Sequence, residues 1–393
     1  MSLTSRKRML LALDRREPDH TPCSFMLFGG LWSGSASYLA FIQGLLDLSL
    51  DAYVQIPPRE PRLMNDFHNL YGCAVNYHPK VRIEEWVENR SEERYPILVK
   101  QYHTPAGILS TEVRRTEDWR YGNHIPFLDD YLSSRSLKFL VEGSEDLDKL
   151  AYLLVKPTPE EAAAFQSVSR APIEFARQKG LLLAGGWGVG ADIFGWIYGL
   201  QNMLYAVYDQ PVFIQQMLDL FADWNRSRME LVLAAGVDLY IKRAWYENCD
   251  FWSPNKFKQF LAPILKSEAD LAHQHGARLG YLITANCMPL LDQIAGCGVD
   301  VIIGVDPLAY DLAQTKKILG GRVCLWGGVN GHLTVERGSP GEVRQEVQRA
   351  MELLAPGGGF ILSPVDNVRE LTSQARENVL ALIDEWQRLN RGK

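Results

Sequence analysis

Residues 278–303 read RLGYLITANCMPLLDQIAGCGVDVII, and this stretch decides the fold. An apolar run over 278–283 predicts a buried strand, and apolar positions over 287–296 recur with the period of a helix. A second apolar run over 299–303 predicts the next strand. Near-continuous apolar strands that alternate with helices are typical of a parallel sheet covered by helices on both faces. We therefore predict a strand–helix–strand unit of an α/β protein.

The same unit recurs along the chain. Further apolar runs predict strands at 181–184, 237–241, 323–326 and 359–362. Helical periodicity predicts helices over 211–234, 254–276, 308–319 and 340–354. Two earlier candidate strands, at 23–28 and 51–56, bring the expected number of strands to eight. Eight strands with helical returns favour a (β/α)8 TIM barrel over an open doubly wound sheet, and we expect residues 1–393 to form this single domain.

Residues 75–125 have a different pattern. Polar and apolar residues alternate over 81–87 and over 97–102, which is typical of exposed strands. Pro105 and Gly107 supply a turn after the second of these stretches. We predict an antiparallel β-hairpin insertion that follows the second strand of the barrel and belongs to the same domain.

Composition excludes several classes of protein. The 393 residues are 47% hydrophobic and 22% charged, as in ordinary globular enzymes. The net charge of −6, without a cluster of Lys or Arg, argues against a nucleic-acid partner. No apolar run reaches the roughly 18–20 residues of a membrane span, and no apolar leader is visible. The 6 Cys form no C-x-x-C pair or secreted disulfide pattern. We expect a cytoplasmic enzyme for a small molecule, as a monomer or a homodimer.

The carboxyl ends of the strands are where a barrel builds its active site. Glu247 and Asp366 follow two of the expected strands, and such carboxyl groups serve as general acids or bases. Lys242 and Arg243 suit a clamp for a substrate carboxylate, and a solvated loop with internal ion pairs is the alternative. The candidate substrate-binding residues at these strand ends are Lys242, Arg243, Trp187, Trp245, Tyr246, Asn286 and Asn330. The tryptophans among them suit either an aromatic pocket or ordinary core packing.

A metal site is a further possibility at the same edge. Glu247, Cys249 and Asp366 together offer thiolate and carboxylate ligands, which zinc accepts. No His lies in these loops, so buried structural thiols at Cys249 and Cys287 are the alternative.

Several motifs carry a family resemblance over nearly the whole chain. They lie at 4–8, 16–19, 104–107, 235–238, 253–263, 275–277, 327–330 and 354–362. As a set they resemble the uroporphyrinogen decarboxylase superfamily, a (β/α)8 barrel group that also contains corrinoid-linked methyltransferases. The resemblance implies the barrel fold and leaves the activity to be decided by the site residues.

The chain departs from the decarboxylases of this superfamily. Their substrate-binding Arg-Gln-Ala-Gly-Arg stretch corresponds to residues 28–32, which contain no Arg. Asp366 stands where the resemblance places a His after the last strand. The polycarboxylate uroporphyrinogen would leave several buried carboxylates unpaired in such a site. A decarboxylase for a porphyrinogen-like or smaller carboxylate stays an alternative, with Arg59 and Arg243 as its cations.

The methyltransferase branch is the leading interpretation. The chain is similar to methylcobamide:coenzyme M methyltransferases, whose zinc ligands correspond here to Leu282, Thr284 and Asp366. The resemblance implies transfer of a methyl group from a small O- or N-methylated donor to a corrinoid on a partner protein. Glu247 or Asp366 would then assist the leaving group, and zinc would need the different ligand set given above. A non-catalytic small-molecule-binding barrel is the third alternative.

Overall fold

A computed structural model of the chain describes residues 3–58 and 76–391. The chain divides into two compact units, each described here by itself. The first unit comprises Met1–Glu60, Gln166–Gly186 and Val232–Lys393, and the second comprises Pro61–Phe165 and Trp187–Leu231. The predicted cation Arg59 lies outside the described residues. None of the helices that the structure describes is long and apolar enough to cross a bilayer.

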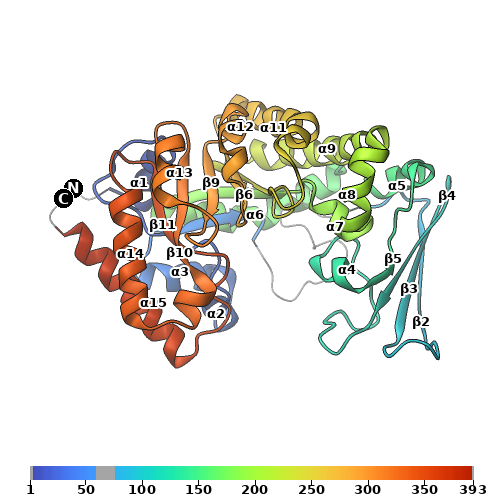
Figure 1. Cartoon of the computed structure of the whole chain (residues 1–393), viewed down its shortest axis with the longest axis horizontal. Helices are drawn as coiled ribbons and strands as arrows, with labels where there is room; N and C mark the ends of the chain where they lie inside the picture. Colours follow the sequence, from blue (N-terminus) through green and yellow to red (C-terminus); the bar gives the residue numbers. More distant parts are fainter. Residues whose placement is uncertain (1–2, 59–75, 392–393) are drawn as a thin grey trace. The chain divides into compact units, whose positions relative to one another are not determined.

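A 7-stranded parallel sheet forms the core of the α/β fold (Figure 1). The sheet curls, as the strands of a (β/α)8 barrel do, and its strands lie in the order β1-β6-β7-β8-β9-β10-β11. Their bounds are β1 (Tyr53–Ile56), β6 (Leu182–Gly188), β7 (Leu239–Arg243), β8 (Arg278–Leu282), β9 (Val301–Val305), β10 (Cys324–Asn330) and β11 (Phe360–Val365). Nearly every residue in these strands is buried, which explains their near-continuous apolar sequences.

The strand predicted at 23–28 does not form. This segment makes two isolated parallel bridges, from Cys23 to Leu362 and from Leu27 to Asn367. Between them the Met26 N–H donates to the side-chain hydroxyl of Ser363 at 3.0 Å, which interrupts the backbone ladder. The segment therefore lies beside β11, at the place of an eighth strand, without regular pairing.

Five strands, β6, β7, β9, β10 and β11, run further toward their carboxyl ends than the apolar runs predict. β6 continues through Trp187, β7 includes Lys242 and Arg243, and β10 ends at Asn330. Lys242, Arg243 and Asn330 are only 2%, 9% and 7% exposed. A prediction from hydrophobicity stops at such residues, because it cannot see the partners that allow polar groups to be buried.

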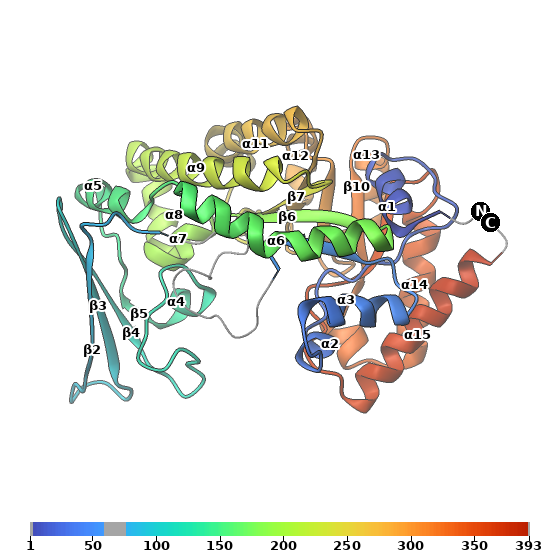
Figure 2. The ribbon, with the colours of Figure 1, turned by 180° about the vertical axis from the view of Figure 1, so that it is seen from behind.

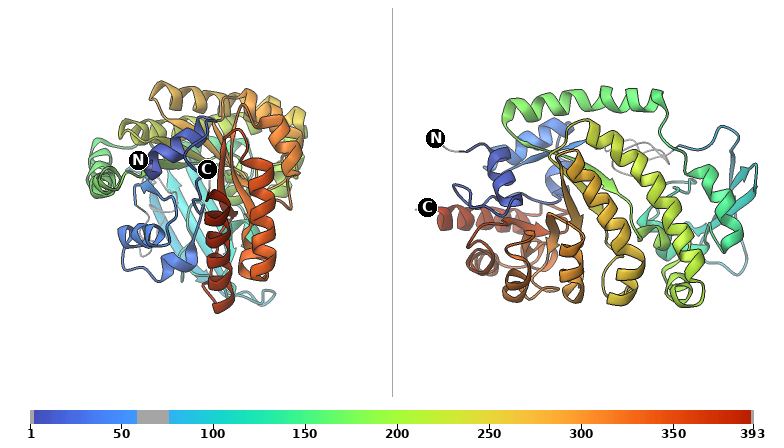
Figure 3. Two further views of the ribbon diagram at one scale, coloured as in Figure 1. Left: turned by 90° about the vertical axis from the view of Figure 1, so that its left-hand side faces the viewer. Right: turned by 90° about the horizontal axis from the view of Figure 1, so that it is seen from above.

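Helices cover the curled sheet of the first unit. α14 packs against β10, β11 and α15 (Figures 1 and 3). α11 packs against β8. The elements outside the sheet are α1 (Ser5–Leu13), α2 (Gly29–Ser33), α3 (Tyr38–Asp47), α6 (Pro159–Lys179), α9 (Pro211–Ala234), α10 (Pro254–Lys256), η4 (Phe257–Leu261), α11 (Ala262–Gln274), η5 (Met288–Leu290), α12 (Leu291–Gly296), α13 (Leu312–Leu319), η6 (Gly331–Glu336), α14 (Pro340–Leu354) and α15 (Ser373–Asn390). α6 and α9 continue from one unit into the other.

The helix predicted over 254–276 is present with one irregularity. η4 is a π-helical turn between α10 and α11, and Pro263 follows it in the first turn of α11. Proline has no backbone N–H and cannot continue a regular α-helical ladder, so the backbone adjusts just before it. By contrast, α14 begins regularly, because Ser339 and Glu342 form a reciprocal capping box.

The second unit contains a 4-stranded antiparallel sheet in the order β2-β3-β4-β5 (Figure 2). Its strands are β2 (Arg82–Glu88), β3 (Ile97–Thr104), β4 (Gly107–Arg114) and β5 (Ser136–Lys138). Its short helices are α4 (Asp130–Arg135), η2 (Ser144–Asp146), α5 (Leu147–Leu150), η3 (Ala151–Leu153), α7 (Asp192–Ile197) and α8 (Leu200–Asp209). Antiparallel strands thus occupy the region where the sequence predicts them. That residues 75–125 are an insertion within one domain spanning 1–393 stays a prediction.

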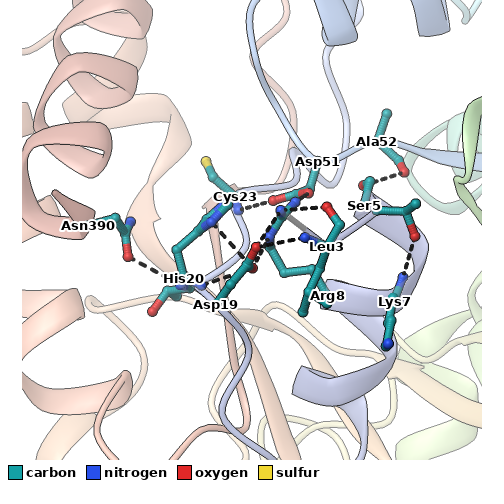
Figure 4. A network of polar contacts seen from close by, with 12 residues as sticks. Leu3, Ser5, Lys7, Arg8, Asp19, His20, Cys23, Asp51, Ala52 and Asn390 are labelled. Atoms are coloured by element: carbon teal, nitrogen blue, oxygen red, sulfur yellow. Dashed lines mark hydrogen bonds and ion pairs between the residues drawn. The ribbon is translucent and has the colours of Figure 1, made fainter. Parts of the chain in front are cut away.

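A buried ionic network ties α1 to the amino-terminal end of β1 (Figure 4). Arg8 donates to Asp51 at 2.6 Å and to Asp19 at 2.7 Å. The second oxygen of Asp51 accepts the Cys23 N–H at 3.3 Å. The network therefore joins three segments at the end of the sheet opposite the strand ends where a barrel places its active site, so its role is in stability.

Candidate active site

Lys242 lies at the carboxyl end of β7 between two buried carboxylates. Its Nζ is 2.6 Å from Oε2 of Glu268, which α11 supplies, and 4.0 Å from Oε1 of Glu247. The three side chains are at most 9% exposed. An ion pair so far removed from water needs close partners, because an unpaired buried charge is strongly destabilising.

Tyr281 adds a phenol to this group. The sheet register places Tyr281 of β8 beside Lys242 of β7, so their side chains project from the same face. The Tyr281 hydroxyl donates to Oε2 of Glu247, whose backbone N–H closes a turn onto the Ala244 carbonyl at 3.1 Å. Lys242, Glu247, Glu268 and Tyr281 form a desolvated network, which we call the Lys242 cluster.

Arg243 points to the other side of β7, because successive side chains alternate along a strand. Its guanidinium lies 3.9 Å from the ring centroid of Trp245, within the range of a cation–π contact. Trp252 donates to the Tyr246 carbonyl at 2.8 Å, and the Asn248 side chain bonds the Trp245 carbonyl. The loop after β7 is therefore folded on itself and does not form the solvated loop considered as the alternative.

Two acidic side chains follow β9 and β11. Asp306 accepts hydrogen bonds from Asn330 at 2.8 Å and from the Leu308 N–H at 2.9 Å. Burial raises the pKa of Asp306, and the charge of Asp366 raises it further. Burial also raises the pKa of Asp366, against the opposing charge of Arg369 at 3.7 Å. These strand ends thus carry two carboxyl groups that keep their protons to higher pH than usual.

The cysteines near this edge are not activated. Cys287 Sγ lies 2.7 Å from the Tyr310 hydroxyl, and burial raises the pKa of the Cys287 thiol to about 12. Burial also raises the pKa of Cys249, whose N–H donates to the Asn286 carbonyl at 2.9 Å. A neutral thiol is a poor nucleophile, so both cysteines match the structural interpretation.

The predicted zinc ligands Glu247, Cys249 and Asp366 are not brought together. Within residues 3–58 and 76–391, no three His, Cys, Asp or Glu side chains are placed so that they could hold a metal ion. The physical reason at Glu247 is that its two oxygens face Tyr281 and Lys242. Leu282, one of the positions implied by resemblance, has no donor atom in its side chain. The residues that the structure describes therefore bring together no set of side chains that fits zinc.

The remaining candidates are spread over the two units. Lys242, Arg243, Trp245, Tyr246, Glu247, Asn286, Asn330 and Asp366 all belong to the first unit. Trp187 is 8% exposed near the end of β6 and belongs to the second unit.

Sequence reasoning missed Glu268, Tyr281 and Asp306. Asp306 follows β9 directly and would have been found had the predicted strand been extended from 303 to 305. Tyr281 lies inside a predicted strand, where its pairing with Lys242 depends on the sheet register. Glu268 lies in the middle of a helix and carries no sequence signal, because acidic residues there usually face water.

Comparison with known proteins identifies the family. Residues 145–388 match the sequence model of uroporphyrinogen decarboxylase (URO-D). The chain belongs to the URO-D family. This confirms the resemblance on which the sequence analysis relies.

Two curated relatives and one solved structure of similar fold are described as methyltransferases. The chain is similar to the methylcobamide:CoM methyltransferase MtaA of Methanosarcina barkeri, with 26% identity over 168 residues, covering 42% of this chain and 48% of the relative. The same protein from the Fusaro strain is 27% identical over 168 residues. The chain thus spans about half the length of the curated relatives it matches. A methyltransferase from Methanosarcina mazei has the same fold, with a TM-score of 0.60 at 18% identity and 99% coverage of both chains.

Proposed function

We propose that this chain is a methyltransferase that passes a methyl group from a small O- or N-methylated donor to a corrinoid carried by a partner protein. Membership of the URO-D family and the similarity to methylcobamide:CoM methyltransferases support the class of reaction. The observation that carries the proposal is the position of Asp366 directly after β11, at the edge of the sheet where a barrel builds its active site. Demethylation needs a proton donor at such a place, and burial raises the pKa of this carboxyl group.

The chemistry explains why an acid is needed. The corrinoid, as the methyl acceptor, supplies the electron pair of the new bond to carbon. The donor's oxygen or nitrogen keeps the pair of the bond that breaks, and it must be neutralised as it leaves. Transfer of the Asp366 proton to that atom gives an alcohol, phenol or amine, so the atoms and charges balance. No step is assigned to zinc, because the described residues bring together no set of side chains that fits it.

Asp366 is the better acid of the two predicted catalytic residues. Glu247 already accepts a hydrogen bond from Tyr281 and faces Lys242 at 4.0 Å, so both of its oxygens are turned toward groups of the protein itself. Asp306 accepts a hydrogen bond from Asn330 at 2.8 Å and so holds the end of β10 in place. We assign the proton to Asp366 and a positioning role to the Lys242 cluster.

Arg243 and Trp245 suit recognition of the donor. The guanidinium is fixed over the Trp245 ring and is 9% exposed, so little side-chain entropy is lost when it pairs with an acidic group of a ligand. A methoxylated aromatic acid offers both an aromatic surface and a carboxylate. This class of donor therefore fits the two side chains.

An anaerobic assay tests the proposal. Purified full-length chain is mixed with reduced cobalamin and, in turn, with methoxylated benzoates and methylamines, while the visible spectrum reports methylation of the corrinoid. Methylation that requires the protein and one donor class is the expected result. Release of carbon dioxide from a small carboxylate, without methylation, would identify the decarboxylase instead. Binding of these compounds with neither product would favour the non-catalytic barrel.

A further inference from the structure

The outer strand of the antiparallel sheet is unusually exposed. β2 lies at the end of the strand order, and among the described residues it pairs with β3 alone. Ile83, Trp86 and Val87 are each 37% exposed, although they are large apolar residues in a regular strand. An edge with open backbone groups and exposed apolar side chains is a template for addition of another strand.

The sequence of β2 is complementary to itself in one antiparallel register. The strand runs from Arg82 to Glu88, and its midpoint is Glu85. A two-fold axis through Glu85 places Arg82 of each copy opposite Glu88 of the other copy, so the interface contains two such pairs. The same register places Ile83 opposite Val87 on the other face, also twice. Residues opposite each other in an antiparallel pair lie about 4.5–5.5 Å apart at Cβ, close enough for these pairs to form.

The two neighbouring antiparallel registers either bring like charges together or leave strand residues without a partner in the second strand. An axis through Trp86 would place Glu84 opposite Glu88 of the second copy, and two like charges directly opposite are destabilising. An axis through Glu84 would leave Val87 and Glu88 facing residues outside the strand, because β2 begins at Arg82. Only the axis through Glu85 pairs all 7 residues of the strand.

Glu85 lies on the two-fold axis, and its negative charge is offset by partners within its own chain. Two Glu85 side chains would face each other there, which by itself is unfavourable. Glu85 lies 3.4 Å from the buried ammonium of Lys100 and 3.0 Å from His124, and it accepts the Ile125 N–H at 3.0 Å. The carboxylate is therefore held by its own unit, and its charge is offset before the second copy approaches.

The surroundings of Arg82 and Glu88 allow both side chains to form an ion pair with a second copy. Arg82 is 66% exposed and forms an ion pair with Glu84 of its own strand, which is itself half-exposed. Glu88 is held in place by Arg90 at 2.7 Å and by the Trp86 indole N–H at 2.8 Å. A second guanidinium at Glu88 would extend this ion pair into a network across the interface.

We propose that β2 is an interaction surface for a second copy of this chain, joined edge to edge through Glu85 into one continuous antiparallel sheet. The proposal is independent of the methyltransferase assignment, because it rests on residues of the second unit alone. It predicts a reversible homodimer whose strength depends on the charges at 82 and 88.

Charge reversal tests the register directly. Sedimentation velocity of the full-length chain from about 1 to about 100 μM spans the range in which a moderate interface dissociates. Arg82→Glu and Glu88→Arg should each raise the dissociation constant about tenfold or more, since each creates two like-charge pairs. The double variant, and an equal mixture of the two single variants, should restore dimerisation, because opposite charges then face each other again.

Controls separate the interface from folding. Arg94→Glu reverses a 76% exposed charge in the same unit outside β2 and should leave the dimer unchanged. Circular dichroism should show the same secondary structure in all variants, and restoration by the double variant excludes a general loss of fold. A chain that is monomeric throughout the concentration range, or a dimer insensitive to both single reversals, would overturn the proposal.

Discussion

Lys242 Nζ lies 2.6 Å from Glu268 Oε2, and this buried pair connects β7 to the helix α11 that precedes β8. The same ammonium lies 4.0 Å from Glu247. One cation thus faces two carboxylates that have almost no contact with water. The geometry of the Lys242 cluster depends on that cation, and the first prediction follows from it.

Replacement of Lys242 by Met should destabilise the protein strongly. Glu247 and Glu268 would lose the cation that they share in a desolvated place, and loss of one partner of a buried ion pair costs about 3–5 kcal/mol. The free energy of unfolding from urea titration measures this. Lys266→Met on α11 is the matched control, because Lys266 is 61% exposed and its ion pair with Asp270 lies at the surface, so a change within about 0.5 kcal/mol is expected. Equal stability of the two variants would show that the cluster is not strongly coupled.

Asp366 should control the pH dependence of methyl transfer. An acid must carry its proton, so the rate should fall as pH rises through the pKa of Asp366, which burial raises above the ordinary aspartate value. Asp366→Asn should abolish this fall and lower kcat by about 10²–10⁴, the usual contribution of a general acid. Asp384→Asn, at a 69% exposed carboxylate on α15, serves as the control. An unchanged pH profile in Asp366→Asn would transfer the role to another group.

The alternation of strands and helices could be predicted because it depends on local periodicity. The runs at 237–241 and 299–303 are apolar on both faces, since both faces of β7 and β9 are buried. The carboxyl ends of the strands could not be located in this way. Lys242 and Asn330 are polar and buried, and only their partners Glu268 and Asp306, distant in sequence, make that burial tolerable.

Some residues of the candidate site could be predicted because their positions depend only on where the strands lie in the sequence. Glu247 and Asp366 follow strands of a barrel-like sheet. The rule that a barrel builds its active site at the carboxyl ends of its strands needs only the strand positions, so it could be applied to the sequence. It cannot show that Glu247 faces Tyr281 rather than Cys249, which depends on the register of β7 against β8. Nor can it show that Glu247, Cys249 and Asp366 are not brought together among the described residues. Side chains can follow strands at the same edge of a sheet and still lie too far apart to bind one ion.

Neutralising Asp306 should stabilise the protein at high pH only. The pKa of Asp306 is raised in the folded state by burial and by Asp366, so the folded state binds the proton more tightly than the unfolded state. Stability from this group is fully present below the unfolded pKa of about 3.9 and is lost as pH rises through the folded value. Asp306→Asn should therefore be more stable than the wild type at pH 8 and equal to it near pH 4. Asparagine keeps an oxygen that can accept from Asn330.

Thermal unfolding at both pH values measures this difference. Asp311→Asn is a less suitable comparison, because Asp311 caps α13. Asp384→Asn on α15 is the better control and should show no difference between the two conditions. A stabilisation of Asp306→Asn that is the same at pH 4 and pH 8 would argue against titration of Asp306 as its cause.

Arg8 should be essential for stability although it lies far from the candidate active site along the strands. Its guanidinium is 8% exposed and bonds both Asp51, which is 4% exposed, and Asp19. Arg8→Met would leave the Asp51 carboxylate buried without its cation, at a cost of about 3–5 kcal/mol. Lys7→Ala on the same helix removes an exposed charge and should change the free energy of unfolding by about 0.5 kcal/mol or less.

The double variant Arg8→Met with Asp51→Asn distinguishes a stranded charge from lost packing. Asparagine keeps an oxygen for the Cys23 N–H, which now bonds Asp51 at 3.3 Å, but it carries no charge. If the stranded carboxylate causes the loss, the double variant should recover a large share of the stability that Arg8→Met loses. If the double variant is as unstable as Arg8→Met alone, the arginine acts mainly by joining α1 to the segments before β1, through its contacts with Asp19 and the Leu3 carbonyl.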